Sequence, residues 1–205
     1  TIAFPDVDQS LSGMEAKRQQ ARIRQMMFQD PYASLDPRKR VDAIIGEPLA
    51  IHKEGSSADR KRRVGDLLEE VGLSRTAADR YPHEFSGGQR QRIGLARALA
   101  LQPKLVIADE PVSALDVSIQ AQILNLMQDL QSERNLSYIL ISHDLAVVQY
   151  VSDRIMVMYL GKVVEIGPAN DVLSHPAHHY TQGLLDAVPV PDVAAAPKAR
   201  APESR

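Results

Sequence analysis

The sequence predicts an α/β fold in which helices cover a parallel β-sheet. Two apolar segments, residues 105–108 and 138–141, have the length and composition of buried strands. Between them, residues 117–131 carry apolar side chains at helical spacing. Strands that alternate with helices in this way form parallel sheets with helices on their faces. A chain of 205 residues suits one medium domain, or one core with a smaller subdomain.

The first forty residues predict one strand and one loop. Residues 1–25 are polar, and the apolar trio Met26-Met27-Phe28 that follows has the character of a short buried strand. Gln29-Asp30-Pro31 ends this strand, because proline disfavours continuation of a helix or a sheet ladder. Residues 30–40 contain two prolines and several turn formers, and they therefore predict a loop.

Residues 41–72 predict a small helical subdomain, in which the basic segment 60–63 is a connection. A longer helix is predicted for residues 86–101, because Ser86 provides a cap at its start and Pro103 follows its end. The apolar residues at helical spacing in the subdomain are Ile44, Ile45, Leu49, Val64, Leu67, Leu68 and Val71.

The remaining segments predict a short helix at residues 145–151 and an antiparallel hairpin at the margin of the sheet. The two hairpin strands, residues 155–159 and 163–166, flank Leu160-Gly161-Lys162. Residues 189–205 are dominated by proline, alanine and charged side chains, so they predict a disordered tail.

Bulk composition excludes several classes of function. A formal net charge of -2 gives no global electrostatic reason for binding nucleic acid, so no nucleic-acid partner is expected. The absence of cysteine from the sequence excludes disulfides, thiolate metal sites and iron–sulfur clusters. No apolar run approaches the roughly 18 residues that span a bilayer, and the first residues do not form a signal peptide pattern. Any membrane association is therefore expected to come through a protein partner.

The turn Ser86-Gly87-Gly88 opens the predicted helix 86–101. A helix N-terminus has unpaired backbone N–H groups and a partial positive charge, so it attracts phosphate. The two glycines leave room for an anion, and the Ser86 hydroxyl can donate a hydrogen bond to it. The same residues also occur in ordinary capped helices, so the turn alone leaves both interpretations open.

The carboxylates Asp109 and Glu110 follow the buried strand 105–108 directly. They stand at the carboxyl end of a central strand, where open α/β sheets bind ligands. Asp109 would hold Mg²⁺ through water, because magnesium gives up its hydration reluctantly. Glu110 would polarise an attacking water as general base. A solvated acidic pair is the alternative, but an apolar strand that stops at Asp-Glu-Pro favours a site.

Three further polar residues are candidates for the same site. Asp116 ends the tight loop Ser113-Ala114-Leu115-Asp116 and predicts a cap for the next helix. His143 follows the strand 138–141 and lies beside Asp109 if the two strands are neighbours. Gln29 follows the first apolar trio. Each residue is also typical of a structural role, as a cap, a packed histidine and a turn residue.

The order of these elements resembles the ATP-binding cassette (ABC) ATPase family, whose matching elements are the Q-loop, the signature motif, Walker B, the D-loop and the H-loop. The resemblance covers residues 1–189 and is closest to the ATPase subunits of oligopeptide and dipeptide importers. The finer match rests on Phe28-Gln29-Asp30-Pro31-Tyr32-Ala33-Ser34-Leu35-Asp36-Pro37-Arg38, on Arg80-Tyr81-Pro82-His83-Glu84-Phe85, on residues 112–122 and on His178-His179-Tyr180-Thr181-Gln182.

The resemblance implies a P-loop NTPase-like (RecA-like) parallel sheet core that is incomplete at the N-terminus, with an inserted α-helical subdomain and a C-terminal extension. The implied segments are the remainder of an N-terminal ATP-binding core (1–29), the Q-loop and helical signature subdomain (30–102), the core with Walker B, D-loop and H-loop (103–170), the peptide-importer extension (171–188) and the disordered tail (189–205).

The resemblance also implies ATP and Mg²⁺ as cofactors and a role for each matching residue. Asp109 would be the magnesium carboxylate and Glu110 the catalytic base, and His143 would contact the γ-phosphate and help to hold the water. Gln29 would sense magnesium and water and connect the site with the membrane partner. ATP held by the opposite subunit would be bound by Ser86, Gly87, Gly88 and Gln89, and Asp116 would couple the two sites.

The implied function is ATP hydrolysis that energises peptide uptake. The partners would be a second ATPase subunit, identical or paralogous, the transmembrane permease subunits and, indirectly, an extracytoplasmic solute-binding protein. The location would be peripheral, at the cytoplasmic face of the inner membrane. Two alternatives stay open: transport of nickel or another small solute, and a catalytically silent dimerisation or regulatory module.

One element of the family pattern is missing from the sequence. It contains no Gly-x-x-x-x-Gly-Lys-Ser/Thr, and its one Gly-Lys pair, Gly161-Lys162, precedes valine. That loop cradles the phosphates and supplies a lysine and a magnesium ligand. In the family it precedes the strand that corresponds to residues 2–4. We therefore expect a fragment or a truncated product of a longer subunit, which is inactive on its own.

Overall fold

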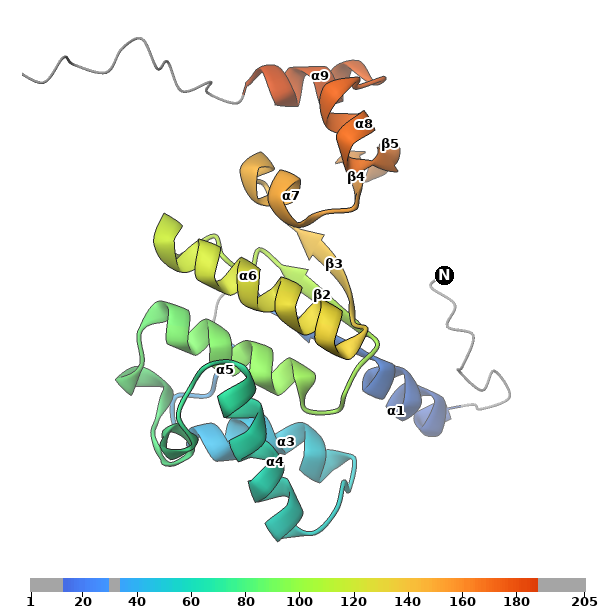
Figure 1. Cartoon of the computed structure of the whole chain (residues 1–205). Helices are drawn as coiled ribbons and strands as arrows, with labels where there is room; N and C mark the ends of the chain where they lie inside the picture. Colours follow the sequence, from blue (N-terminus) through green and yellow to red (C-terminus); the bar gives the residue numbers. More distant parts are fainter. Residues whose placement is uncertain (1–12, 30–33, 188–205) are drawn as a thin grey trace, which may run out of the picture. The chain divides into compact units, whose positions relative to one another are not determined.

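A computed structural model describes residues 13–29 and 34–187 of the chain. The chain divides into two compact units, residues 1–147 and 148–205. Figure 1 shows the helices and strands of both units, coloured along the sequence from blue to red. Within the part of the chain that is described, no helix is long and apolar enough to cross a membrane.

Among the described residues, the first unit is built on a three-stranded parallel sheet. Its strands are β1 (Arg24–Met27), β2 (Leu105–Asp109) and β3 (Ser137–Ile141), in the order β1-β2-β3. Both strand pairs are parallel, and Met27 pairs with Ala108 while Asp109 pairs with Ile141. The predicted parallel sheet is therefore confirmed, with β2 in its centre. All three strands end at the same edge.

Helix α5 (Gly87–Leu99) and helix α6 (Val117–Arg134) accompany this sheet. Helix α5 contacts both β1 and α6. Ser86 caps α5 and Asp116 caps α6, as the sequence predicts. At its other end, α6 closes on Asn135 in the left-handed conformation, which asparagine tolerates better than most residues.

The segment predicted as a helical subdomain, residues 41–72, is helical. It contains α3 (Val41–Ile51) and α4 (Ser57–Glu70), followed by short 3₁₀ turns at Arg75–Asp79 and Pro82–Glu84. Both helices pack against α5. All seven apolar residues that predict the subdomain are buried, with at most 4% of any side chain exposed: Ile44, Ile45, Leu49, Val64, Leu67, Leu68 and Val71.

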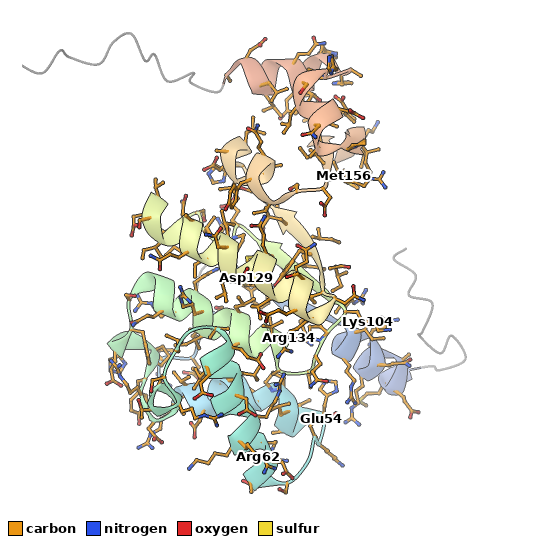
Figure 2. All side chains as sticks on the ribbon, in the orientation of Figure 1. Glu54, Arg62, Lys104, Asp129, Arg134 and Met156 are labelled. Atoms are coloured by element: carbon orange, nitrogen blue, oxygen red, sulfur yellow. The ribbon has the colours of Figure 1, made fainter. Side chains whose placement is uncertain are left out.

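The second unit contains an antiparallel hairpin of β4 (Arg154–Tyr159) and β5 (Lys162–Pro168), with α8 (Ala169–Ser174) packed on it. Its small core consists of Ile155, Ala169 and Val172. Helix α9 (His179–Asp186) follows, and α7 (Leu145–Val151) spans the boundary between the units. Figure 2 shows Met156 on β4, whose side chain is 54% exposed.

Several sequence predictions need correction. The hairpin forms a two-stranded sheet of its own among the described residues, rather than the margin of the parallel sheet. The basic segment 60–63 lies inside α4 and is no connection. Helix α1 (Gly13–Ile23) was not predicted, because it buries none of its residues and so has no apolar pattern. The strand that the family resemblance implies at residues 2–4, part of the predicted loop 30–40 and the predicted tail 189–205 lie outside the described residues.

The parallel sheet has one buried face and one open face in the part of the chain that is described. On the buried face, Met27, Val106 and Ala108 are at most 2% exposed. The opposite face carries Met26 and Ile139, which are 39% and 40% exposed. The predicted buried trio at residues 26–28 is thus wrong for Met26 and Phe28, because alternate side chains of a strand point to opposite faces.

We predict that this open apolar face makes the chain self-associate, because parallel sheets are normally covered on both faces. Substitution Ile139→Lys places a charge on the open face and should shift the chain towards monomer at the same protein concentration. The control Gln122→Lys adds the same charge on the exposed side of α6. Static light scattering measures the mass, and a stable wild-type monomer would contradict the prediction.

Candidate functional site

The candidate site lies where the three parallel strands end. Asp109 is the last residue of β2, and Glu110 begins the connection from β2 to α6. The Glu110 backbone N–H donates to the Ile141 carbonyl at 2.9 Å, so the last residue of β3 holds Glu110 beside its own end. Glu110 has a φ of 45°, in the left-handed region that residues with a Cβ rarely adopt. Strained backbone of this kind collects at functional sites.

Glu110 joins residues from the two neighbouring strands. Gln29, two residues beyond β1, donates its Nε2 hydrogen to Glu110 Oε2 at 2.7 Å. His143, two residues beyond β3, has its Nδ1 2.9 Å from Glu110 Oε1. Each carboxylate oxygen therefore has a different partner. The Glu110 side chain is 22% exposed and the His143 side chain 71%, so the group lies at the surface within reach of a ligand.

The contact between Glu110 and His143 shifts the pKa values of both side chains. The hydrogen bond to His143 is the largest influence on Glu110 and holds the pKa of its carboxyl below the usual value. The hydrogen bond to Glu110 in turn raises the pKa of His143. Between these two pKa values the pair consists of a carboxylate and an imidazolium. An ionised Glu110 can accept a hydrogen bond from water, as a water-polarising residue must.

The connection between β2 and α6 shapes a small hollow next to this group. The hollow has a volume of about 70 Å³. The Ser113 hydroxyl donates to the Glu110 carbonyl at 3.2 Å, and the Asp144 carboxylate accepts from the Ala146 N–H at 2.9 Å at the start of α7. The residues that line the hollow are Glu110, Val112, Ser113, Gln120, Ser142, His143, Asp144 and Val147.

The turn Ser86-Gly87-Gly88-Gln89, here called the signature turn, forms a capping box at the start of α5. The Ser86 hydroxyl oxygen accepts from the Gln89 N–H at 3.3 Å, and the Gln89 side chain accepts from the Ser86 N–H at 3.0 Å. The Ser86 O–H hydrogen is not used in the first of these bonds and can serve a ligand. The ordinary capped helix is therefore confirmed, and it is compatible with anion binding.

The two glycines of this turn have a packing role that the sequence did not predict. A Cβ on Gly88 would lie 2.4 Å from Ile119 Cγ2, which no real pair of atoms tolerates. A Cβ on Gly87 would lie 3.2 Å from Leu115 Cδ2. That these glycines leave room for an anion stays a prediction, whereas the close approach of α6 and its preceding loop is observed.

The structure brings some predicted site residues together and separates others. Gln29, Glu110 and His143 form one hydrogen-bonded group. Asp109 pairs with Ile141 in the sheet, so the predicted neighbourhood of β2 and β3 is confirmed. Asp116 caps α6 by accepting from the Ile119 N–H at 3.0 Å. The signature turn lies beside Leu115 and Ile119 and does not line the hollow at Glu110.

Sequence reasoning missed Gln120, which lines the hollow from α6. Its amide donates to the Val112 and Leu115 carbonyls, both at 3.0 Å. A glutamine within a helix is common, and its sequence position gives no signal of this role. Only the fold of the preceding loop reveals it.

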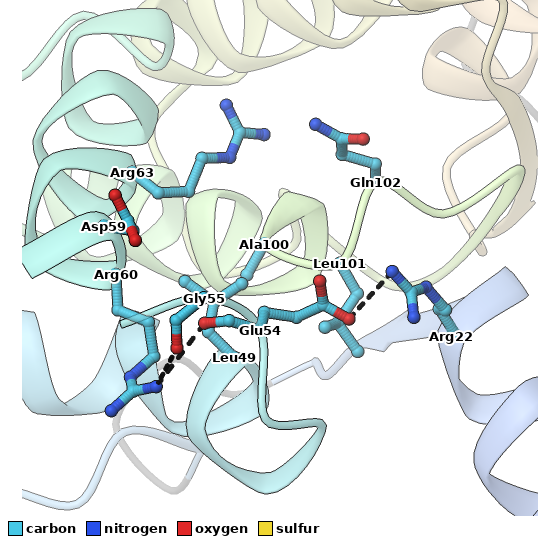
Figure 3. Close-up of a pocket in the computed structure, with 10 residues that line it drawn as sticks. All are labelled: Arg22, Leu49, Glu54, Gly55, Asp59, Arg60, Arg63, Ala100, Leu101 and Gln102. Atoms are coloured by element: carbon cyan, nitrogen blue, oxygen red, sulfur yellow. Dashed lines mark hydrogen bonds and ion pairs between the residues drawn. The ribbon is translucent and has the colours of Figure 1, made fainter. Parts of the chain in front are cut away.

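A second cavity, of about 200 Å³, lies between α1, α4, the connection from α3 to α4 and the end of α5 (Figure 3). Arg22 forms an ion pair with Glu54 at 2.8 Å, and Arg60 donates to the Gly55 carbonyl at 2.8 Å. Within the described ranges, no predicted site residue lines this cavity. Its larger volume therefore does not make it the candidate site.

Solved structures place this fold in the P-loop NTPase-like class of ATP-binding cassettes. A dimeric post-hydrolysis structure of the ATP-binding cassette MJ0796, bound to ADP and Pi, is 28% identical with a TM-score of 0.66. The alignment covers 78% of this chain and 68% of that chain. A second structure, cbiO1 of Clostridium perfringens, part of the ABC transporter complex cbiONQ, is 25% identical with a TM-score of 0.70 and coverages of 82% and 65%.

Two protein-family models match segments of this chain. Residues 5–113 match the family described as ABC transporter, and residues 164–205 match the oligopeptide/dipeptide transporter C-terminal region. Because the first match covers more than half of the sequence, the chain belongs to the ABC transporter family.

Curated relatives have similar sequences but are longer. The oligopeptide transport ATP-binding protein OppF of Bacillus subtilis is 60% identical over 83% of this chain and 56% of that protein. The dipeptide transport ATP-binding protein DppF of Haemophilus influenzae is 54% identical over 85% of this chain and 54% of that protein. The chain spans about half the length of these relatives.

We predict that the pKa of His143 lies above its ordinary value of about 6.5 and that Glu110 is the cause. Substitution Glu110→Gln keeps the shape of the side chain but removes its charge, so the pKa of His143 should fall towards the ordinary value. NMR titration of the His143 ring protons measures this, with Asp129→Asn on the exposed side of α6 as control. Equal His143 titrations in wild type and Glu110→Gln would refute the assignment.

Proposed function

We propose that this chain is part of the ATP-binding and ATP-hydrolysing subunit of an ABC importer for oligopeptides or dipeptides. The observation that carries the proposal is the hydrogen-bonded group of Gln29, Glu110 and His143 beside Asp109 at the carboxyl edge of the sheet. Peptide transport is supported by the relatives, whose names refer to oligopeptide and dipeptide transport, and by the match of residues 164–205.

The residues present are chemically suited to Mg²⁺. The Asp109 carboxylate and the Gln29 amide oxygen are hard oxygen donors, which this ion prefers, and Mg²⁺ keeps several waters instead of taking a full protein cage. Among the described residues no group of three or more His, Asp or Glu side chains is placed to hold a metal. Asp109 and Gln29 would therefore hold the ion together with water and phosphate oxygens. Bound there, Mg²⁺ would neutralise charge on the phosphates.

The side chains then have distinct tasks. Glu110 accepts a hydrogen bond from the attacking water and aligns it, while Gln29 and His143 fix the two oxygens of its carboxylate. His143 lies on the exposed side of this contact and can donate to a γ-phosphate. The signature residues Ser86 and Gly88, at the N-terminus of α5, would bind the phosphate of ATP held by a second subunit, supported by the helix dipole. Gly87 and Gln89 would complete that turn.

The proposed assembly contains two ATPase subunits, identical or paralogous, and the transmembrane permease subunits. The MJ0796 structure is described as dimeric and cbiO1 as part of a transporter complex, which supports this arrangement. Asp116 would couple the two sites across the interface between the ATPase subunits. The location would be peripheral, at the cytoplasmic face of the inner membrane, and an extracytoplasmic solute-binding protein would take part indirectly.

The solute is the least constrained part of the proposal. Transport of nickel or another small solute is the second candidate, because the residues of the proposed ATP site do not contact the transported solute. A catalytically silent module is less favoured, since Glu110 keeps both of its side-chain partners.

We predict that the 205-residue chain alone binds ATP weakly and has no measurable turnover, because its sequence lacks the glycine-lysine loop that cradles the phosphates. Isothermal titration calorimetry with Mg-ATP measures the affinity directly. A dissociation constant on the order of micromolar would show that the remaining residues suffice for binding, contrary to the prediction.

In a transporter whose ATPase subunit combines this chain with a glycine-lysine loop, Glu110→Gln should lower kcat for ATP hydrolysis by roughly 10²- to 10⁴-fold, the usual contribution of a general base. The KM for ATP should change little, because Glu110 acts on water rather than on the nucleotide. The control Glu133→Gln changes an exposed glutamate of α6 in the same way. A Glu110→Gln transporter with wild-type turnover would eliminate Glu110 as the catalytic base.

A further inference from the structure

The segment 110–116, here called the 110–116 loop, connects the catalytic edge of the sheet with α6. It folds into consecutive tight turns, in which the Ser113 N–H donates to the Glu110 carbonyl at 3.3 Å and the Leu115 N–H donates to the Val112 carbonyl at 3.1 Å. Pro111 and Val112 are buried, whereas Ser113 and Asp116 are exposed. The loop thus has an anchored beginning and an exposed end.

Gln120 holds this loop from the first turns of α6. Its Nε2 donates to the Val112 carbonyl and to the Leu115 carbonyl, each at 3.0 Å. A side-chain amide nitrogen has two hydrogens, and both are used here. The Gln120 backbone N–H donates to the Asp116 carbonyl at 2.8 Å, which fixes the residue to the start of the helix. The side chain is partly buried, so these bonds are shielded from competing water.

These bonds make a continuous support for Glu110. On one side, the Glu110 N–H is bonded to Ile141 in β3. On the other side, the Glu110 carbonyl accepts from the Ser113 N–H and hydroxyl, and the turn that contains Ser113 is held by Gln120. Glu110 keeps a left-handed backbone, which persists only where the surroundings enforce it. Through the side-chain amide of Gln120, α6 holds the 110–116 loop in this conformation.

We propose that Gln120 is a positioning residue for the hydrolytic site, which fixes the 110–116 loop so that Glu110 faces the attacking water and Asp116 faces the second subunit. This inference rests on the proposed ATPase function. It deepens that function by adding a residue whose side-chain amide bonds to the loop that carries Glu110. Removal of both donors frees the two carbonyl oxygens, and the loop then gains conformations in which Glu110 is misaligned.

Amide hydrogen exchange of the 205-residue chain tests the loop directly. The variants are Gln120→Leu, which has no donor, and Gln120→Glu, which brings a carboxylate to two carbonyl oxygens. Both should accelerate exchange of the Ser113 and Leu115 amides by about tenfold or more, as expected for the loss of two hydrogen bonds of ordinary strength. Exchange of Met127 in the middle of α6 should stay unchanged, and Gln122→Leu, an exposed glutamine of the same helix, should have no effect. Wild-type exchange at Ser113 and Leu115 in both Gln120 variants would overturn the proposal.

ATP hydrolysis tests the link to chemistry, in a transporter whose ATPase subunit combines this chain with a glycine-lysine loop. Both Gln120 variants should lower kcat by about tenfold or more and leave the KM for ATP within about twofold of wild type. An unchanged kcat together with faster loop exchange would overturn the positioning role and leave the ATPase function intact. A wild-type transporter that hydrolyses no ATP would instead overturn the proposed function, and with it the role of Gln120.

Discussion

The parallel pairing of β1, β2 and β3 is the constraint on which the candidate site depends. Gln29, Glu110 and His143 are far apart in sequence, yet each stands one or two residues beyond the end of its strand. Because the strands are parallel and in register, their carboxyl ends share one edge, and the three side chains meet there. A shift of one residue in β3 would move His143 to the other side of the sheet and break its contact with Glu110.

A second constraint acts through the backbone of Glu110. Asp109 is the last residue of β2, and the left-handed φ of 45° at Glu110 takes the chain out of the extended conformation directly after it. Asp109 belongs to the strand and pairs in register with Ile141. The Glu110 carboxylate instead contacts Gln29 and His143. Two adjacent acids can thereby have different roles: in the proposed function, Asp109 binds the metal ion and Glu110 aligns the water molecule. The loop bonds to Ser113 and Gln120 maintain this division.

Local patterns predicted most of the elements. Apolar segments predicted β2 and β3, helical spacing predicted α6, and the Ser86 cap together with Pro103 predicted α5. His143 was expected beside Asp109 if the two strands were neighbours, and the strand order confirms that they are. Other features depend on tertiary packing. Helix α1 has no buried side chain that could produce a pattern, and an apolar β3 gave no sign that Ile139 would be exposed. The close approach of Ile119 to Gly88 joins segments that only the fold brings together, and the bonds of Gln120 likewise require the shape of the loop.

The account depends most on the hydrogen-bonded group at Glu110, and one measurement observes it without nucleotide or partner. NMR of the 205-residue chain reports whether the Gln29 side-chain amide protons show nuclear Overhauser contacts with the Glu110 side chain. The account predicts such contacts in the wild type, together with slow exchange of the Gln29 amide, and the loss of both in Glu110→Ala. A Gln29 amide without contact to Glu110 and with free exchange would contradict the convergence of the strand ends on one site.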